Sequence, residues 1–164
     1  MILNADSVPA TASTLFRKAH PGTGLFEVGT GSAVNHVSSD YIAYCWTEIE
    51  GYSKFGKYRG SGSDDDAFIY CGFKPAFIMI KNITASSDQS WAIYDSARDS
   101  TNPLITDLAA NSNLAEGEKA PSYKLDLVSN GIKIKYHANW LSLNNHDHIF
   151  MAFAESPFQT ANAK

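Results

Sequence analysis

Two short apolar runs, at 68–71 and 76–80, stand out in the middle of the chain. They are separated by Gly72-Phe73-Lys74-Pro75, and each ends at a breaker, which is typical of β-strands rather than helices. Residues 77–80 are apolar at odd and even positions alike, so both faces of this strand must be covered. Burial of each such side chain contributes about 1.5–3 kcal/mol. The pattern predicts that these two runs form the core, with 76–80 inside a sheet.

Weaker periodic runs predict further strands on both sides of this core. They are expected at 25–28, 41–48, 51–60, 91–94, 124–128, 132–136 and 148–155. Asn130-Gly131 is a strong hairpin signal, and the alternating Lys and Asp residues around it indicate one wet face. The long polar connection 96–123 is expected on the surface, with a helical turn at 104–110. About nine short strands with turns between them predict an all-β fold with very little helix, a two-sheet antiparallel β-sandwich or jelly roll.

The ends of the chain show little periodicity. We expect residues 1–24 to form an N-terminal arm or linker, 25–158 the sandwich domain, and 159–164 a C-terminal tail. Leu15 and Phe16 are apolar residues in the expected arm, which suggests that it docks on another chain.

Composition narrows the class of protein. A chain of 164 residues with 44% hydrophobic and 18% charged residues is expected to be one globular domain. The net charge of −4 without a Lys/Arg cluster argues against a nucleic-acid partner. No apolar run approaches the length of about 18 residues that a membrane span needs, and 1–6 lack the features of a signal peptide. Cys45 and Cys71 lie in apolar runs and are expected as buried thiols, with a disulfide only between neighbouring strands.

Five stretches of the sequence resemble a module of tail-fibre and other virion proteins of bacteriophages, often marine ones. They are YIAYCWTEIEGYSKFGKYRGSGS at 41–63, YCGFKPAFIMIK at 70–81, WAIYDSARD at 91–99, LVSNGIK at 127–133 and FMAFAESPF at 150–158, in the family's order. The resemblance covers 25–158 and implies a jelly roll of the concanavalin A-like lectin/glucanase type. It also implies a virion location, other virion proteins as partners and a homo-oligomer, with a trimer as one form. The chain departs from the family pattern in its shortness, its own N-terminal arm and its more acidic Asp64-Asp65-Asp66 turn.

The polar stretch 136–147 is the predicted ligand site. Its indole, Trp140, lies beside the amides of Asn139, Asn144 and Asn145 and the imidazole of His146, a combination that suits saccharide stacking and hydrogen bonding. This would let the protein contact host-surface glycans. The alternative left open is that Trp140 closes one end of the sandwich or a subunit interface; Trp46 and Trp91 lie within predicted strands and are expected in the core.

Two weaker clusters could hold a metal. His146 and His148 fall on one face if a strand begins there, and His137 is close in sequence. Asp64 and Asp66 offer oxygen ligands for Ca²⁺, but no EF-hand spacing supports them. A solvated loop end for the histidines and a charged surface turn for the aspartates are the favoured explanations, so no metal and no cofactor is predicted.

Catalysis is not predicted. Glycoside hydrolysis needs two carboxylates facing each other across a cleft, and no strand carries a paired cluster among the candidates, which are Glu48, Glu50, Asp95, Asp99 and Glu155. There is no nucleophile elbow, P-loop or complete dinucleotide fingerprint. The sequence predicts a non-catalytic structural component of a phage virion; the alternatives are a free-standing carbohydrate-binding module and a glycan-degrading enzyme of the same fold.

Overall fold

The computed structural model describes residues 15, 25–65, 67–85, 90–117, 124–136 and 139–156. The chain divides into two compact units. The larger unit comprises Met1–Pro9 and Thr47–Lys164, and the smaller comprises Ala10–Trp46. All the named strands lie in the larger unit.

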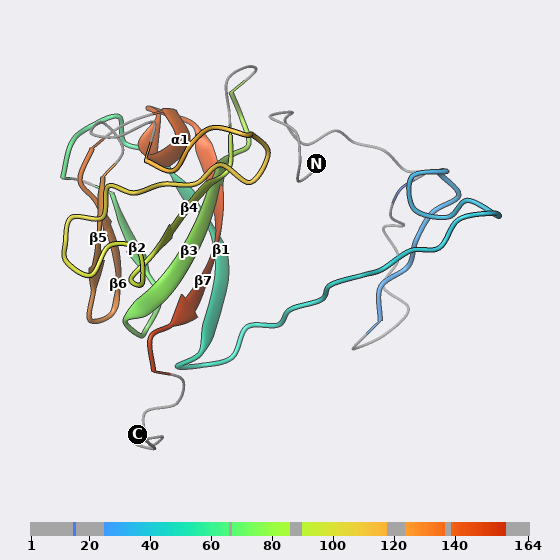
Figure 1. Ribbon diagram of the computed structural model, residues 1–164, viewed down its shortest axis with the longest axis horizontal. Helices are drawn as coiled ribbons and strands as arrows, with labels where there is room; N and C mark the ends of the chain where they lie inside the picture. Colours follow the sequence, from blue (N-terminus) through green and yellow to red (C-terminus); the bar gives the residue numbers. More distant parts are fainter. Residues whose placement is uncertain are drawn as a thin grey trace. The chain divides into compact units, whose positions relative to one another are not determined.

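The larger unit is an antiparallel β-sandwich, which confirms the predicted fold class (Figure 1). Its strands are β1 (Ser53–Arg59), β2 (Phe68–Tyr70), β3 (Pro75–Asn82), β4 (Ala92–Asp95), β5 (Leu125–Val128), β6 (Gly131–Ile134) and β7 (Asp147–Ala154). One sheet has the order β1-β7-β3-β4 and the other β2-β6-β5. The four-residue helix α1 (Asn139–Ser142) is the one helix in the described ranges, and none there is long and apolar enough to cross a membrane. The finer jelly-roll topology stays a prediction.

The strand predicted to be central is central. β3 pairs with β4 on one side and β7 on the other, so its backbone groups are satisfied on both edges. Ile78 and Ile80 point into the core between the sheets, whereas Met79 and Lys81 are buried on the opposite face. The Nζ of Lys81 lies 5.5 Å from the ring centroid of Trp91, which helps to accommodate the buried charge. The first apolar run forms β2 in the opposing sheet, so the two runs contribute to the same core from different sheets.

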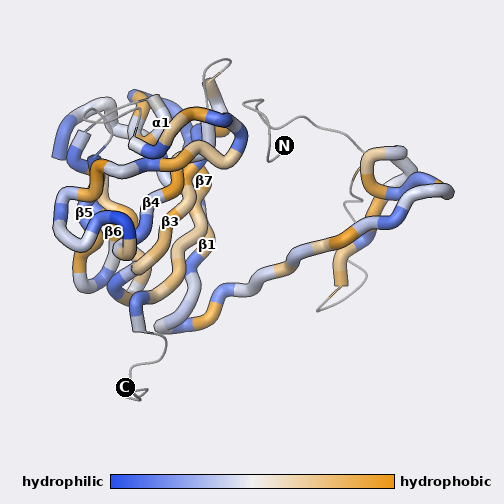
Figure 2. The backbone as a smooth tube through the Cα atoms, viewed as in Figure 1, coloured by the Kyte–Doolittle hydropathy of each residue, from blue (hydrophilic) through white to orange (hydrophobic). Residues whose placement is uncertain are grey.

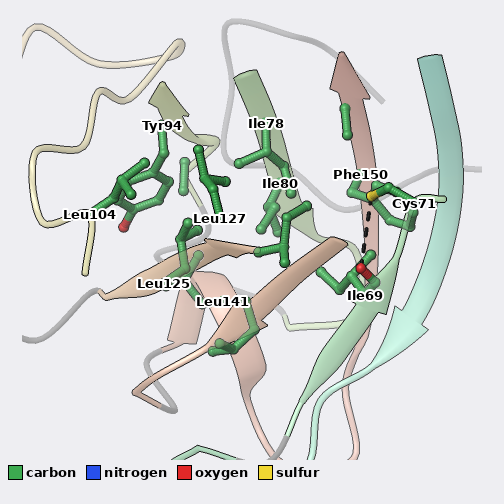
Figure 3. Packing of buried hydrophobic residues seen from close by; sticks show 14 of the residues in the cluster. Ile69, Cys71, Ile78, Ile80, Tyr94, Leu104, Leu125, Leu127, Leu141 and Phe150 are labelled. Carbon is green, nitrogen blue, oxygen red and sulfur yellow. Dashed lines mark hydrogen bonds between the residues drawn. The ribbon is translucent and has the colours of Figure 1, made fainter. Parts of the chain in front are cut away.

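Aliphatic and aromatic side chains from both sheets fill the interior (Figure 3). Ile78 and Tyr94 come from the four-stranded sheet, and Leu125 and Leu127 from the three-stranded sheet. Figure 2 shows the hydrophobic colouring that follows β3 and β7 through this layer. The β5–β6 hairpin forms as predicted, with the opposite charges of Asp126 and Lys133 paired in register on its wet face.

Two predicted strands are absent from the described structure. Residues 25–28 and 41–48 belong to no named strand, and 104–110 forms single bridges instead of a helical turn. Trp46 is 57% exposed and Cys45 is also exposed, so the prediction that they are core residues is wrong. An apolar run becomes a strand only where a neighbouring strand pairs with it, and no described strand pairs with 41–46. Trp91 and Cys71 are buried as predicted, and both cysteines are free.

The core assignment predicts a large cost for truncating Leu125, which is fully buried. Leu125→Ala should lower the free energy of unfolding by about 2–5 kcal/mol, because the neighbours cannot close the cavity completely. The matched control, Leu114→Ala at a 36% exposed position, should change it by no more than about 0.5 kcal/mol. Urea unfolding followed by circular dichroism measures both, and equal losses would contradict the assignment.

Candidate functional site

The predicted ligand site at 136–147 closes one end of the sandwich. α1 inserts Trp140 and Leu141 into the core, where Trp140 is 1% exposed. The Tyr58 hydroxyl donates to the Leu141 carbonyl oxygen, and the Ser61 N–H donates to Ser142 Oγ at 3.1 Å. The prediction that Trp140 presents its indole to a sugar is therefore wrong, because no face of the ring is accessible. The alternative, that it plugs the sandwich end, is confirmed.

The amides predicted around Trp140 have different environments. Asn144 and Asn145 are exposed, and the side chain of Asn139 lies outside the described part. Asn145 has φ of 59°, the left-handed conformation that asparagine tolerates in a turn, and its N–H donates to the Gly60 carbonyl at 3.1 Å. A Cβ at Gly60 would lie 2.2 Å from the Leu143 carbonyl oxygen, so this close approach requires glycine. These contacts give Asn145 a structural role in the turn.

The histidine pair is packed into the fold. His148 is fully buried and stacks on Tyr58, with ring centroids 5.0 Å apart and an interplanar angle of 17°. Its Nδ1 lies 3.1 Å from the His146 carbonyl oxygen. Within the described ranges, no group of three or more His, Cys, Asp and Glu side chains is placed to hold a metal. His137 lies outside those ranges.

Asp65 of the acidic turn lies beside two lysines. The carboxylate of Asp65 pairs with Lys135 and lies 3.5 Å from Lys133 Nζ. Its hydrogen bond with Lys135 lowers the pKa of Asp65. Asp64 is exposed and Asp66 is outside the described residues, so the predicted Ca²⁺ ligands are not brought together by any contact seen here.

Four of the five carboxylates weighed for glycoside hydrolysis, Glu48, Asp95, Asp99 and Glu155, make local structural contacts. Glu155 pairs with Lys74 at 2.8 Å, and Glu48 pairs with Lys54. Asp95 accepts from Arg98 Nε at 2.6 Å; burial raises the pKa of Asp95, but the hydrogen bonds from Arg98 outweigh burial and lower it. A general acid for glycoside hydrolysis instead needs a raised pKa.

Asp99 organises the loop that follows β4. Its carboxylate accepts from the backbone N–H groups of Ile105 at 2.7 Å and Thr106 at 2.6 Å, and from Thr106 Oγ1 at 2.7 Å. Burial raises the pKa of Asp99, but these bonds outweigh it and lower the pKa. The contacts are those of a loop anchor.

The strongest candidate binding surface is the solvent side of the four-stranded sheet. We call it the outer aromatic face: Tyr52, Phe55, Phe77, Met151 and Phe153, all half-buried. The Phe153 ring is central, with centroids 6.1 Å from Tyr52, 5.9 Å from Phe55 and 6.0 Å from Phe77. Three strands contribute to the face: Phe55 comes from β1, Phe77 from β3, and Met151 and Phe153 from β7. On β3 and β7 these residues alternate with the core-facing residues.

Such a face can bind another apolar surface by burial of its side chains, with no reaction involved. Aromatic rings and methionine are enriched in the cores of protein interfaces, and edge-to-face ring pairs preorganise the surface. Sequence reasoning did not assign this face. The available signal was that 77–80 is apolar at both parities while Phe55 and Phe153 fall at alternate positions in neighbouring strands.

The Asp99 contacts predict a pH-dependent stability. Because the pKa of Asp99 is lowered on folding, its contribution is present above the unfolded pKa and is lost as pH falls through the folded pKa. Asp99→Asn should cost about 1 kcal/mol at neutral pH, discounted for solvent screening, and nothing in strong acid. Urea unfolding at neutral pH and in strong acid measures the change in the free energy of unfolding, with Asp40→Asn at an exposed position as the control. A loss of stability that is the same at both pH values would contradict the prediction.

Burial should also make the Cys71 thiol unreactive in the folded protein. Burial raises the pKa of Cys71 to about 12, and the charge of Lys54 offsets this only in part. In a Cys45→Ser background, iodoacetamide at about pH 8.5 should leave Cys71 unmodified until urea unfolds the protein, because the thiolate is the nucleophile. Mass spectrometry reads the modification, with Cys71→Ser as the matched variant whose exposed Cys45 reacts. Rapid labelling of folded Cys71 would contradict the assignment.

Comparison with known proteins adds one finding to this geometry. Residues 1–157 match a family described as a domain of unknown function, DUF7483. No curated protein and no solved structure matches the chain. Since the family match spans far more than half of the 164 residues, the chain belongs to the DUF7483 family.

Proposed function

We propose that this protein is a non-catalytic structural component of a bacteriophage virion that packs against other virion proteins through its outer aromatic face. The observation that carries the proposal is the ring cluster around Phe153 on the solvent side of the sheet. Half-exposed rings gathered from three segments favour a broad apolar partner surface. The virion setting rests on the resemblance of the five sequence stretches to tail-fibre modules.

The local roles of the acidic residues support a non-catalytic function. Asp95 and Asp99 anchor the loop after β4 with lowered pKa values, and Glu48 and Glu155 pair with lysines. Neither arrangement resembles an acid and a nucleophile poised across a sugar. A homo-oligomer, of which a trimer is one form, is the assembly we propose.

Glycan binding is the second candidate. With Trp140 enclosed in the core, stacking on a sugar would fall to rings at the surface, and Tyr52 and Phe55 of the outer aromatic face are two of them. A free-standing carbohydrate-binding module would show selective hits on a glycan array that Phe55→Ala removes. If the face instead packs against virion proteins, the array should show no selective hits.

The proposal predicts that the chain is an integral part of purified phage particles at a fixed copy number. Phe55→Asp should lower its incorporation about tenfold, equivalent to 1.4 kcal/mol, because a carboxylate would be desolvated in the interface. Quantitative mass spectrometry of particles measures this. Ile105→Asp, at another exposed apolar position, is the control and should be incorporated normally. Absence of the wild-type chain from particles, or turnover of a glycan by the pure protein, would contradict the proposal.

A further inference from the structure

Segment 41–46 has the side-chain pattern of a strand but pairs with no described strand. Ile42, Tyr44 and Trp46 lie at alternate positions and are 81%, 75% and 57% exposed, and the last two rings stack with centroids 6.2 Å apart. On the opposite side Ala43 and Cys45 are small, and Tyr41 begins the segment. Figure 1 draws the segment as an extended trace without a strand arrow. An extended run with one bulky apolar side is suited to strand addition at a sheet edge.

The sandwich has four edge strands, and two are covered by other segments of the chain. Leu108 exchanges backbone hydrogen bonds with Ile93 of β4, at 2.9 and 3.0 Å. Leu104 does the same with Leu125 of β5, at 2.8 and 3.3 Å. These two bridges occupy the edges of both sheets on the same side of the sandwich.

The edge of β1 carries the charges that natural sheets use against edge pairing. Lys54, Lys57 and Arg59 lie along it, and the last two pair with Asp147 of β7. The backbone groups of its first residue are also paired, because Ser53 exchanges backbone hydrogen bonds with Ile49. Lysine and arginine on an edge strand disfavour addition of another strand.

β2 is the edge that remains. The Ala67 carbonyl accepts from Ile134 and the Cys71 N–H donates to Asn130, both toward β6 or its turn. Because backbone groups alternate in direction along an antiparallel strand, those of Phe68 and Tyr70 point away from β6. Their side chains are 48% and 62% exposed, so this short edge is apolar, and no other segment of the described residues pairs with it.

We propose that segment 41–46 of one chain adds as a strand to the β2 edge of a second copy. The inference rests on the proposed structural role and adds to the outer aromatic face a second contact surface, through which copies of the chain bind one another. Placing Ile42, Tyr44 and Trp46 on the side of Phe68 and Tyr70 forms cross-strand aromatic pairs. The three-stranded sheet then gains a fourth strand, matching the size of the opposite sheet.

A second copy fits because each chain carries one donor segment and one acceptor edge. Donor and acceptor are different surfaces, so the contact is heterologous and leads to a closed ring or an open fibre. In this pairing Cys45 turns to the inner side, beside Ile69. Its thiol, exposed in the single chain, becomes protected on assembly.

Sedimentation velocity of the full chain over a range of concentrations tests the proposal. The wild type should self-associate. Ile42→Asp on the donor and Tyr70→Asp on the acceptor should each weaken association about thirtyfold or more. Val37→Asp and Tyr136→Asp, at other exposed positions, are the matched controls and should associate like the wild type. Alkylation of Cys45 should slow as wild-type concentration rises, but not in the Ile42→Asp variant.

Complementation separates strand exchange from unspecific association. Each single variant retains one working surface, so mixing Ile42→Asp with Tyr70→Asp should give a one-to-one pair. If Tyr70→Asp fails to fold by circular dichroism, Ala43→Pro on the donor, compared with Ile42→Asp, still tests the requirement for strand pairing.

A monomeric wild type, loss of association in the controls, or no pair in the mixture would each overturn the proposal. A monomer that is nevertheless found in particles would overturn strand exchange alone, whereas an assembling chain absent from particles would overturn only the virion role.

Discussion

The whole sandwich depends on β3 being covered on both faces and both edges. Its inner residues Ile78 and Ile80 meet the three-stranded sheet, and Met79 and Lys81 are buried on the other side. β7 and β4 satisfy its backbone. A strand that is buried along most of its length lies inside a sheet and not at its edge. Its half-buried Phe77 contributes to the outer aromatic face, which remains for partners.

The strands of the sandwich were predictable because the spacing of their hydrophobic residues indicates β structure directly. From residue 51 onward, every predicted strand corresponds to a named strand, with small shifts at the ends. The failure at 41–48 has a physical cause: aromatic and β-branched residues indicate a strand, but pairing depends on a neighbour that local sequence does not specify. The burial of Lys81 was not predictable either, because nothing in the neighbouring sequence indicates a buried ammonium group beside Trp91.

Candidate sites were harder to predict than strands. A tryptophan among asparagines has the composition of a sugar site, yet Trp140 packs inward because the short helix α1 closes the end of the sandwich. Composition cannot distinguish a ring that faces a ligand from one that faces the core. The outer aromatic face shows the converse, because its rings are far apart in sequence and meet only through the register of β1, β7 and β3.

The three tryptophans give the molecule built-in optical reporters. Trp46 lies in the smaller unit with its indole in water, whereas Trp91 and Trp140 lie in the larger unit with their rings enclosed. Indole fluorescence moves to longer wavelengths as water reaches the ring, so the red and blue parts of the emission come from different units. Their separate responses to a quencher or to denaturant would follow each unit of the chain without any added label.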